Sequence, residues 1–153
     1  MEIERKFLVR TLPRDLEAYP HTAIEQAYLC RRPVLRVRRE GERYIFTCKG
    51  EGLMERQECN LPLTRQAYKA LLDKTEGGRV TKTRYRIPYE DRVIELDVFA
   101  GALAPLVLAE VEFDSRDQAL AFRPPAWFGR EVTQDPDYTN AALSQADRAP
   151  AIE

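Results

Sequence analysis

The sequence predicts a mainly β, α+β fold in which eight antiparallel strands close into a barrel with a charged interior and a few outer helices. Three observations lead to this prediction. Eight segments alternate polar and apolar residues with a period of two. The connections between several of them are too short for parallel crossovers. Charges of one sign recur two residues apart on the polar faces, and a barrel of eight strands is wide enough to hold them with one small ligand.

The strand-like segments are short and are separated by residues that favour turns. They span residues 2–10, 23–31, 34–40, 43–50, 54–61, 79–88, 92–99 and 106–113. Arg32-Pro33 and Gly50-Glu51-Gly52 are two of the turn sequences between them. Because such short connections join neighbouring strands as hairpins, we expect an antiparallel sheet.

Three helices are predicted outside the strand pattern. The first follows Thr64, a good N-cap residue, and carries an apolar stripe. The second begins at Ser115, with Gln118 in the position of a capping box. A short third helix is expected over about residues 138–146.

Size and composition limit the architecture and the class of partner. A chain of 153 residues without repeats or linkers predicts one domain, residues 1–146, and a flexible tail, residues 147–153. The 24 Lys+Arg and 25 Asp+Glu residues leave a net charge of −1, so no overall basic field for nucleic acid is expected. No apolar run approaches the roughly 20 residues of a membrane span, and the charged N-terminus is unlike a signal peptide. Three cysteines without CxxC spacing fit a reducing compartment, so we expect a cytoplasmic protein.

The polar faces of the predicted strands carry charges that are sorted by sign. The acidic set is Glu2, Glu4, Glu95, Asp97, Glu110 and Glu112, and the basic set is Lys6, Arg36, Arg38, Lys49, Arg56, Lys82 and Arg84. On a single strand, the ordinary interpretation is a solvated face. Repeated like charges cost stability unless an opposite charge lies between them. The repetition over several strands therefore favours a closed barrel with the polar faces turned inward.

Such an interior is suited to an anion bound together with a metal ion. Carboxylates without His or Cys nearby select a hard cation such as Mg²⁺ or Mn²⁺. Arginine forks match phosphate oxygens, and lysine acts as a point charge. A short chain of phosphates with its metal ion fits both sets. The chain has no GxxxxGK[ST] loop, which argues against P-loop chemistry. Its single histidine, His21, lies in no motif that would supply a Ser–His–Asp triad.

The order of these charged motifs resembles the CYTH superfamily, also called the triphosphate tunnel metalloenzymes. Glu2-x-Glu4-x-Lys6 in EIERKFLV is similar to the signature of that family. The likeness continues through LRVRR, FTCKGEG, RQE, KTRY, ELDVF, EVEF and WFGREVT to Tyr138 and Asn140, over nearly the whole chain. The short chain looks most like the small bacterial inorganic triphosphatases of the family.

The resemblance implies an eight-stranded tunnel and a role for most charged residues. Glu2, Glu4, Asp97, Glu110 and Glu112 match the family's metal-binding carboxylates, and Glu95 joins them by its position on the strand. Lys6, Arg36, Arg38, Lys49, Lys82 and Arg84 match its triphosphate cradle, and Arg56 joins them by its charge. The segment from Tyr138 to Leu143 would close one tunnel mouth. We interpret Tyr28 as a packing or lumen-lining residue.

The leading hypothesis is hydrolysis of inorganic triphosphate to pyrophosphate and phosphate, with Mg²⁺ or Mn²⁺ as cofactor. Two ions are expected, one at Glu2, Glu4, Glu110 and Glu112 and a second nearer Asp97. We expect Lys6 and Lys49 to lie closest to the scissile phosphate, as the catalytic residues.

The alternatives are an adenylate cyclase, a nucleoside or thiamine triphosphatase, and a non-catalytic polyphosphate-binding module. The acidic pairs tell against the last of these, because bare carboxylates repel phosphate. The expected partner is a small triphosphate, with no nucleic acid and no membrane. A homodimer is compatible with the sequence, which does not specify it.

Overall fold

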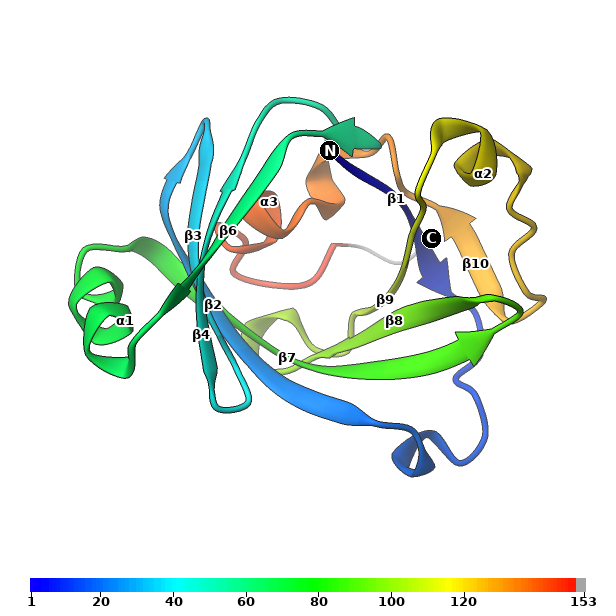
Figure 1. Cartoon of the computed structure of the whole chain (residues 1–153). Coiled ribbons are helices and arrows are strands. Elements are labelled where there is room, and N and C mark those ends of the chain that lie inside the picture. The colour runs from blue at the N-terminus through cyan, green and yellow to red at the C-terminus, as the bar shows by residue number, and fades with distance from the viewer. Residues whose placement is uncertain (151–153) are drawn as a thin grey trace.

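The computed structural model describes residues 1–150, and one antiparallel sheet of ten strands curls into a nearly closed barrel (Figure 1). The strand order is β10-β1-β9-β8-β7-β2-β3-β4-β6, and β5 pairs with β1. The strands are β1 (Glu2–Val9), β2 (His21–Arg31), β3 (Val34–Glu40), β4 (Arg43–Lys49), β5 (Glu55–Arg56), β6 (Glu58–Leu63), β7 (Glu76–Tyr89), β8 (Arg92–Phe99), β9 (Val107–Glu112) and β10 (Phe128–Glu131). The short ladder between β5 and β1 closes the barrel through two residue pairs, Glu2 with Arg56 and Ile3 with Glu55.

The helices are short, and the first two begin where the sequence predicts. They are α1 (Arg65–Leu72), α2 (Arg116–Ala121) and α3 (Asn140–Leu143), with 3₁₀ turns η1 (Leu16–Ala18), η2 (Gly101–Leu103) and η3 (Pro136–Tyr138). The side chains of Thr64 and Ser115 accept hydrogen bonds from the backbone N–H groups of Ala67 and Gln118, as N-caps do. Among residues 1–150, no helix combines the length and the apolar character needed to span a membrane.

The predicted antiparallel barrel is confirmed, and the strands differ from the prediction in three details. The fifth segment divides at Gln57 into β5 and β6, because its first part leaves β4 to pair with β1. Strand β10 was not predicted, since its four residues lack the period of two. Strand β7 begins three residues earlier than expected, through Gly77. There φ is +80°, and a Cβ atom would lie 2.6 Å from Nη2 of Arg31.

The third helix is shorter than the expected 138–146. Its N-cap is Thr139, whose Oγ1 accepts a hydrogen bond from the backbone N–H of Ala142. The preceding residues form η3 instead. Of the predicted tail, Ala149 packs against a buried apolar cluster, and residues 151–153 lie outside the described part of the chain.

Two clusters of buried apolar side chains stabilise the barrel, one on its outside and one inside one end. The first, which includes Phe7, Leu96 and Phe122, lies on the outer faces of the strands under α2 and β10. The second lies at one end of the interior, where Phe99 and Leu108 pack with residues that follow β10. Phe99 is two residues from Asp97 and Leu108 is two from Glu110, so the inward faces change from charged to apolar toward this end.

Candidate active site

Strand alternation turns the predicted basic set into the barrel. Six of its members, Lys6, Arg36, Arg38, Lys49, Lys82 and Arg84, are at most 8% exposed, and Arg56 is partly buried. In the acidic set, Glu4, Asp97 and Glu110 are buried, Glu2 and Glu95 are partly buried, and Glu112 is exposed. Burying so many charges is costly unless each finds an opposite charge or a ligand.

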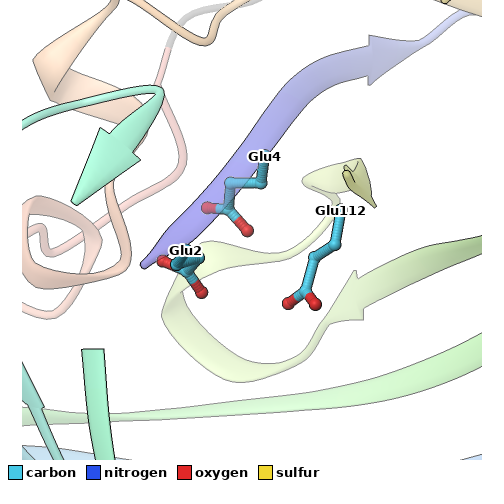
Figure 2. A group of neighbouring side chains, drawn as sticks. All are labelled: Glu2, Glu4 and Glu112. Atoms are coloured by element: carbon cyan, nitrogen blue, oxygen red, sulfur yellow. The ribbon is translucent and has the colours of Figure 1, made fainter. Parts of the chain in front are cut away.

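Three of the predicted metal ligands meet at one place. Oxygen atoms of Glu2, Glu4 and Glu112 lie within 4.8 Å of one another, and Figure 2 shows the three side chains converging from β1 and the end of β9. The pairing of β1 with β9 sets this arrangement, because Glu4 lies directly opposite Glu112. We call this group the acidic cluster.

The carboxyl groups of the acidic cluster resist ionisation, although Lys49 Nζ and Arg56 Nε lie 3.0 Å and 3.5 Å from Glu2 Oε1. Burial, a hydrogen bond with Glu58 and the neighbouring Glu4 raise the pKa of Glu2 to about 8. Burial and the neighbouring Glu95 and Glu4 raise the pKa of Glu112 to about 7. Burial and Glu110 also raise the pKa of Glu4. Three carboxylates that resist ionisation together form an all-oxygen donor set that suits a hard divalent ion.

The other predicted metal ligands, on β8 and β9, are paired with cations instead. Asp97 Oδ2 lies 2.7 Å from Lys82 Nζ, and Asp97 Oδ1 lies 2.8 Å from Arg84 Nε. Arg84 also reaches Glu95 at 3.0 Å and Glu110 at 3.3 Å. We use the name paired wall for these five residues on β7, β8 and β9, namely Lys82, Arg84, Glu95, Asp97 and Glu110. The structure therefore places Glu95, Asp97 and Glu110 in an ion-pair network beside the acidic cluster, close enough for Glu110 and Glu95 to raise the pKa values of Glu4 and Glu112.

The paired wall holds Asp97 and Glu110 in the ionised form, whereas burial and the neighbouring Glu110 raise the pKa of Glu95. Burial alone would raise the pKa of Asp97, but Arg84 and Lys82 outweigh it and keep the pKa below its usual value. Glu110 behaves in the same way, because Lys6 and Arg84 outweigh burial and lower its pKa. Burial lowers the pKa of Lys82 to about 8 against the attraction of Asp97.

The opposite side of the lumen presents cations without carboxylate partners. Among residues 1–150, no carboxylate lies within 4 Å of a guanidinium nitrogen of Arg36 or Arg38. Arg38 Nε donates to Gln26 Oε1 at 2.8 Å, and Arg36 Nη2 donates to Thr47 Oγ1 at 3.2 Å. Burial and the neighbouring Arg36 and Arg84 lower the pKa of Arg38 to about 9. We use the name open wall for four residues on β2, β3 and β4, namely Gln26, Arg36, Arg38 and Thr47.

The open wall also carries buried donors that lack a partner. Nε of Arg36 and Nε2 of Gln26 are both buried, and no hydrogen-bond partner lies near either atom in the described chain. Buried polar groups are normally satisfied, so each such atom calls for an explanation. Unpartnered N–H groups beside unpaired guanidinium groups indicate a place for an anion.

Lys49 connects the open wall to the acidic cluster. Its Nζ lies 3.0 Å from Glu2 Oε1 and 3.8 Å from Glu58 Oε2. Glu58 accepts a hydrogen bond from Asn60 Nδ2 at 2.7 Å. Sequence reasoning missed Glu58 as a site residue, although its place on one face with Arg56 was visible, and it also missed Gln26 because that residue is uncharged.

The C-terminal segment closes one end of the lumen. Lys6 Nζ donates to the backbone oxygen of Tyr138 at 3.0 Å, and Lys82 Nζ donates to Asn140 Oδ1 at 3.2 Å. Arg31 holds α3 through Ser144 Oγ at 2.9 Å. Figure 1 shows α3 within the ring of strands, which agrees with the closure expected for Tyr138 to Leu143.

Tyr28 faces the same lumen. It lies opposite Arg36 in the pairing of β2 with β3 and is 1% exposed. This position agrees with the interpretation of Tyr28 as a lumen-lining residue.

Comparison with known proteins identifies the family. A family model described as CYTH domain matches residues 1–137. The chain belongs to the CYTH domain family. It is 49% identical over 150 residues to a protein of Nitrosomonas europaea named inorganic triphosphatase, covering 94% of this chain and 96% of that one. It is 33% identical to an inorganic triphosphatase of Acetivibrio thermocellus, covering 93% and 92% of the two chains.

A solved structure of the family has the same fold. The crystal structure of an inorganic triphosphatase is 45% identical to this CYTH protein, with a TM-score of 0.71 over 95% of each chain. The barrel, the inward charges and the family match therefore agree with one another.

Proposed function

We propose that this CYTH protein hydrolyses inorganic triphosphate to pyrophosphate and phosphate with the help of Mg²⁺ or Mn²⁺. Two relatives that it matches over more than nine-tenths of its length carry the name inorganic triphosphatase. The observation that carries the proposal is the asymmetry of the lumen. Unpaired Arg36 and Arg38 lie on one wall, and three crowded carboxylates lie at the acidic cluster.

The metal ion would be held by Glu2, Glu4 and Glu112. Their raised pKa values and their convergence fit a site whose ligands become fully charged only when a cation joins them. When bound, such an ion offsets charge on phosphate oxygens and acts as a Lewis acid. The fourth predicted ligand, Glu110, stays a prediction and would have to exchange its ion pairs with Lys6 and Arg84 for a metal contact. A second ion near Asp97 stays a prediction, and it would require Asp97 to exchange its ion pairs with Lys82 and Arg84 for a metal contact.

The basic residues would hold the phosphate chain and stabilise the charge that develops on the transferring group. Arg36 and Arg38 supply the forks that match phosphate oxygens. Lys6 remains charged, because Glu110 and Glu4 outweigh burial and raise its pKa. We propose Lys6 and Lys49 as the catalytic residues nearest the scissile phosphate, since positioning and electrostatics dominate phosphoryl transfer.

The test is phosphate release from tripolyphosphate, ATP and thiamine triphosphate, side by side, with Mg²⁺, Mn²⁺ or EDTA. Fast hydrolysis of tripolyphosphate, slow use of the other two and loss in EDTA would support the proposal. Formation of cyclic AMP and pyrophosphate from ATP would assign the protein to the cyclase alternative. Binding without turnover of any of the three would leave a polyphosphate-binding module.

The location and the oligomeric state also remain proposals. A cytoplasmic location agrees with the three free thiols of Cys30, Cys48 and Cys59. A homodimer is open, and light scattering of the purified protein would decide it.

A further inference from the structure

Two of the three cysteines lie directly opposite each other on the outer face of the barrel. Cys48 on β4 and Cys59 on β6 are partners in the antiparallel ladder. Both are free thiols, Cys59 is exposed, and Cys48 is partly exposed. Because strand alternation turns Thr47 and Lys49 inward, the thiol between them points away from the lumen.

The spacing of opposed residues in such a ladder is close to that of a disulfide. Directly opposed side chains have Cβ atoms about 4.5–5.5 Å apart. A disulfide needs Cβ atoms about 3.5–4.5 Å apart and Cα atoms about 4.4–6.8 Å apart. A local approach of roughly 1 Å between the two strands would therefore join Cys48 and Cys59.

We propose that Cys48 and Cys59 form a reversible redox-modification site that a peroxide converts to a disulfide. The more exposed Cys59 thiolate attacks hydrogen peroxide, so that an S–O bond forms, the O–O bond breaks and, with one proton, water leaves. The Cys48 thiolate then attacks the sulfenic sulfur, so that the S–S bond forms and the S–O bond breaks. A proton completes the second water. Two thiols are oxidised, and one peroxide is reduced to two waters.

The third cysteine lies too far away to compete. Cys30 on β2 is opposite Leu35 on β3, and Leu35 in turn is opposite Cys48. Two strand spacings of about 4.8 Å therefore separate Cys30 from Cys48. The Cys30 Sγ also lies 3.3 Å from the backbone oxygen of Arg32, to which it donates. Cys30 thus provides a matched control within the same chain.

The cysteine pair lies directly behind residues of the lumen. On the inner face, Thr47 Oγ1 lies 2.6 Å from Asn60 Oδ1 on one side of the pair, and Lys49 Nζ lies 3.8 Å from Glu58 on the other. Joining the strands at Cys48 would shift Lys49 relative to Glu2. Misplacement of a catalytic group by about 1 Å can cost up to about 10²-fold in rate. We therefore expect oxidation to lower triphosphate turnover, and this part rests on the proposed function.

The chemical test uses the full-length reduced protein and hydrogen peroxide. Titratable thiols should fall from three to one, the intact mass should drop by two hydrogens, and digestion should yield a linked peptide pair containing Cys48 and Cys59. Dithiothreitol should restore all three thiols. Cys30→Ser should still lose two thiols, whereas Cys48→Ser and Cys59→Ser should form no internal disulfide.

Retention of all three thiols, or oxygen added to single cysteines without a linked peptide, would overturn the proposal. The second readout is tripolyphosphate hydrolysis before oxidation, after it and after reduction. A fall of at least about threefold that reverses in the wild type and is absent in Cys59→Ser is expected. Equal rates of hydrolysis before and after oxidation would show that the disulfide does not affect the residues of the lumen. An inactive reduced protein would contradict the proposed function instead, because the thiol titration does not depend on activity.

Discussion

The paired wall and the open wall carry buried cations in opposite electrostatic settings. On the paired wall, Arg84 contacts Glu95, Asp97 and Glu110 at 2.8–3.3 Å. On the open wall, Gln26 is the one hydrogen-bond partner of the Arg38 side chain among residues 1–150, and burial lowers the pKa of Arg38 to about 9. The paired wall therefore contains its own counter-charges, whereas Arg36 and Arg38 have no paired carboxylate among residues 1–150, and we propose that a bound anion supplies the counter-charge there. Removing a charge should have opposite consequences for stability on the two walls.

The largest effect is expected from Asp97→Asn on the paired wall. It leaves Lys82 and Arg84 buried without their shared counter-charge, and breaking a buried pair costs about 3–5 kcal/mol. Urea unfolding measures the change in the free energy of unfolding. Asp91→Asn is the control, since Asp91 has an 86% exposed side chain. A loss below about 1 kcal/mol, as for a surface pair, would show that the wall is not held together by this carboxylate.

The next effect is expected from Arg38→Met on the open wall. Loss of a charge-stabilising donor of this kind lowers turnover by about 10²–10³-fold. Steady-state hydrolysis of tripolyphosphate is the measurement. Arg39→Met is the matched control, because Arg39 is exposed on the outer face of the same strand. Unchanged kinetics for Arg38→Met would remove this residue from the substrate site.

A smaller effect is expected from Glu4→Gln in the acidic cluster. Losing one of three carboxylate ligands should weaken Mg²⁺ or Mn²⁺ binding by at least about 10-fold, because the loss of an outer-shell partner alone typically costs about 10–100-fold. Calorimetric titration with Mn²⁺ checks this, and Glu42→Gln in the exposed turn after β3 is the control. Equal affinity in both variants would place the metal elsewhere.

The smallest effect concerns pH. The raised pKa values of Glu2, about 8, and Glu112, about 7, mean that the folded protein binds more protons than the unfolded chain between about pH 4.5 and 8. Without metal, their contribution to stability is therefore full below pH 4.5 and is lost as pH rises through 7 to 8. Bound Mg²⁺ favours the ionised forms, so the rise in Tm on adding Mg²⁺ should be larger at pH 8 than at pH 6. An equal rise at both values would contradict the assignment of the ion to this cluster.

Sequence patterns predicted which side chains point into the barrel better than they predicted which charged residues contact one another. Inward placement of Lys6, Arg36 and Arg38 follows from strand alternation, which is a local property. Pairing depends on register between distant strands. The sequence therefore could not distinguish Glu112, which lies opposite Glu4, from Glu110, which lies opposite Lys6.

The sequence failed to predict other features for a similar reason, because they depend on contacts between distant segments. Strand β10 forms because β1 offers an edge to pair with, and not because its four residues alternate. The division between β5 and β6 closes the barrel, which is a requirement of the whole sheet. Uncharged Gln26 joined the site only when the fold placed it beside Arg38.

The difference between the two walls is tested most directly by unfolding the wild type, Arg38→Met and Asp97→Asn in EDTA, with and without tripolyphosphate. We predict that Arg38→Met is at least as stable as the wild type without ligand and loses most of the stabilisation that tripolyphosphate gives. Asp97→Asn should be strongly destabilised whether or not the ligand is present. If Arg38→Met were instead destabilised by several kcal/mol without ligand and kept the full ligand-induced gain, the open wall would be a structural network and not an anion site.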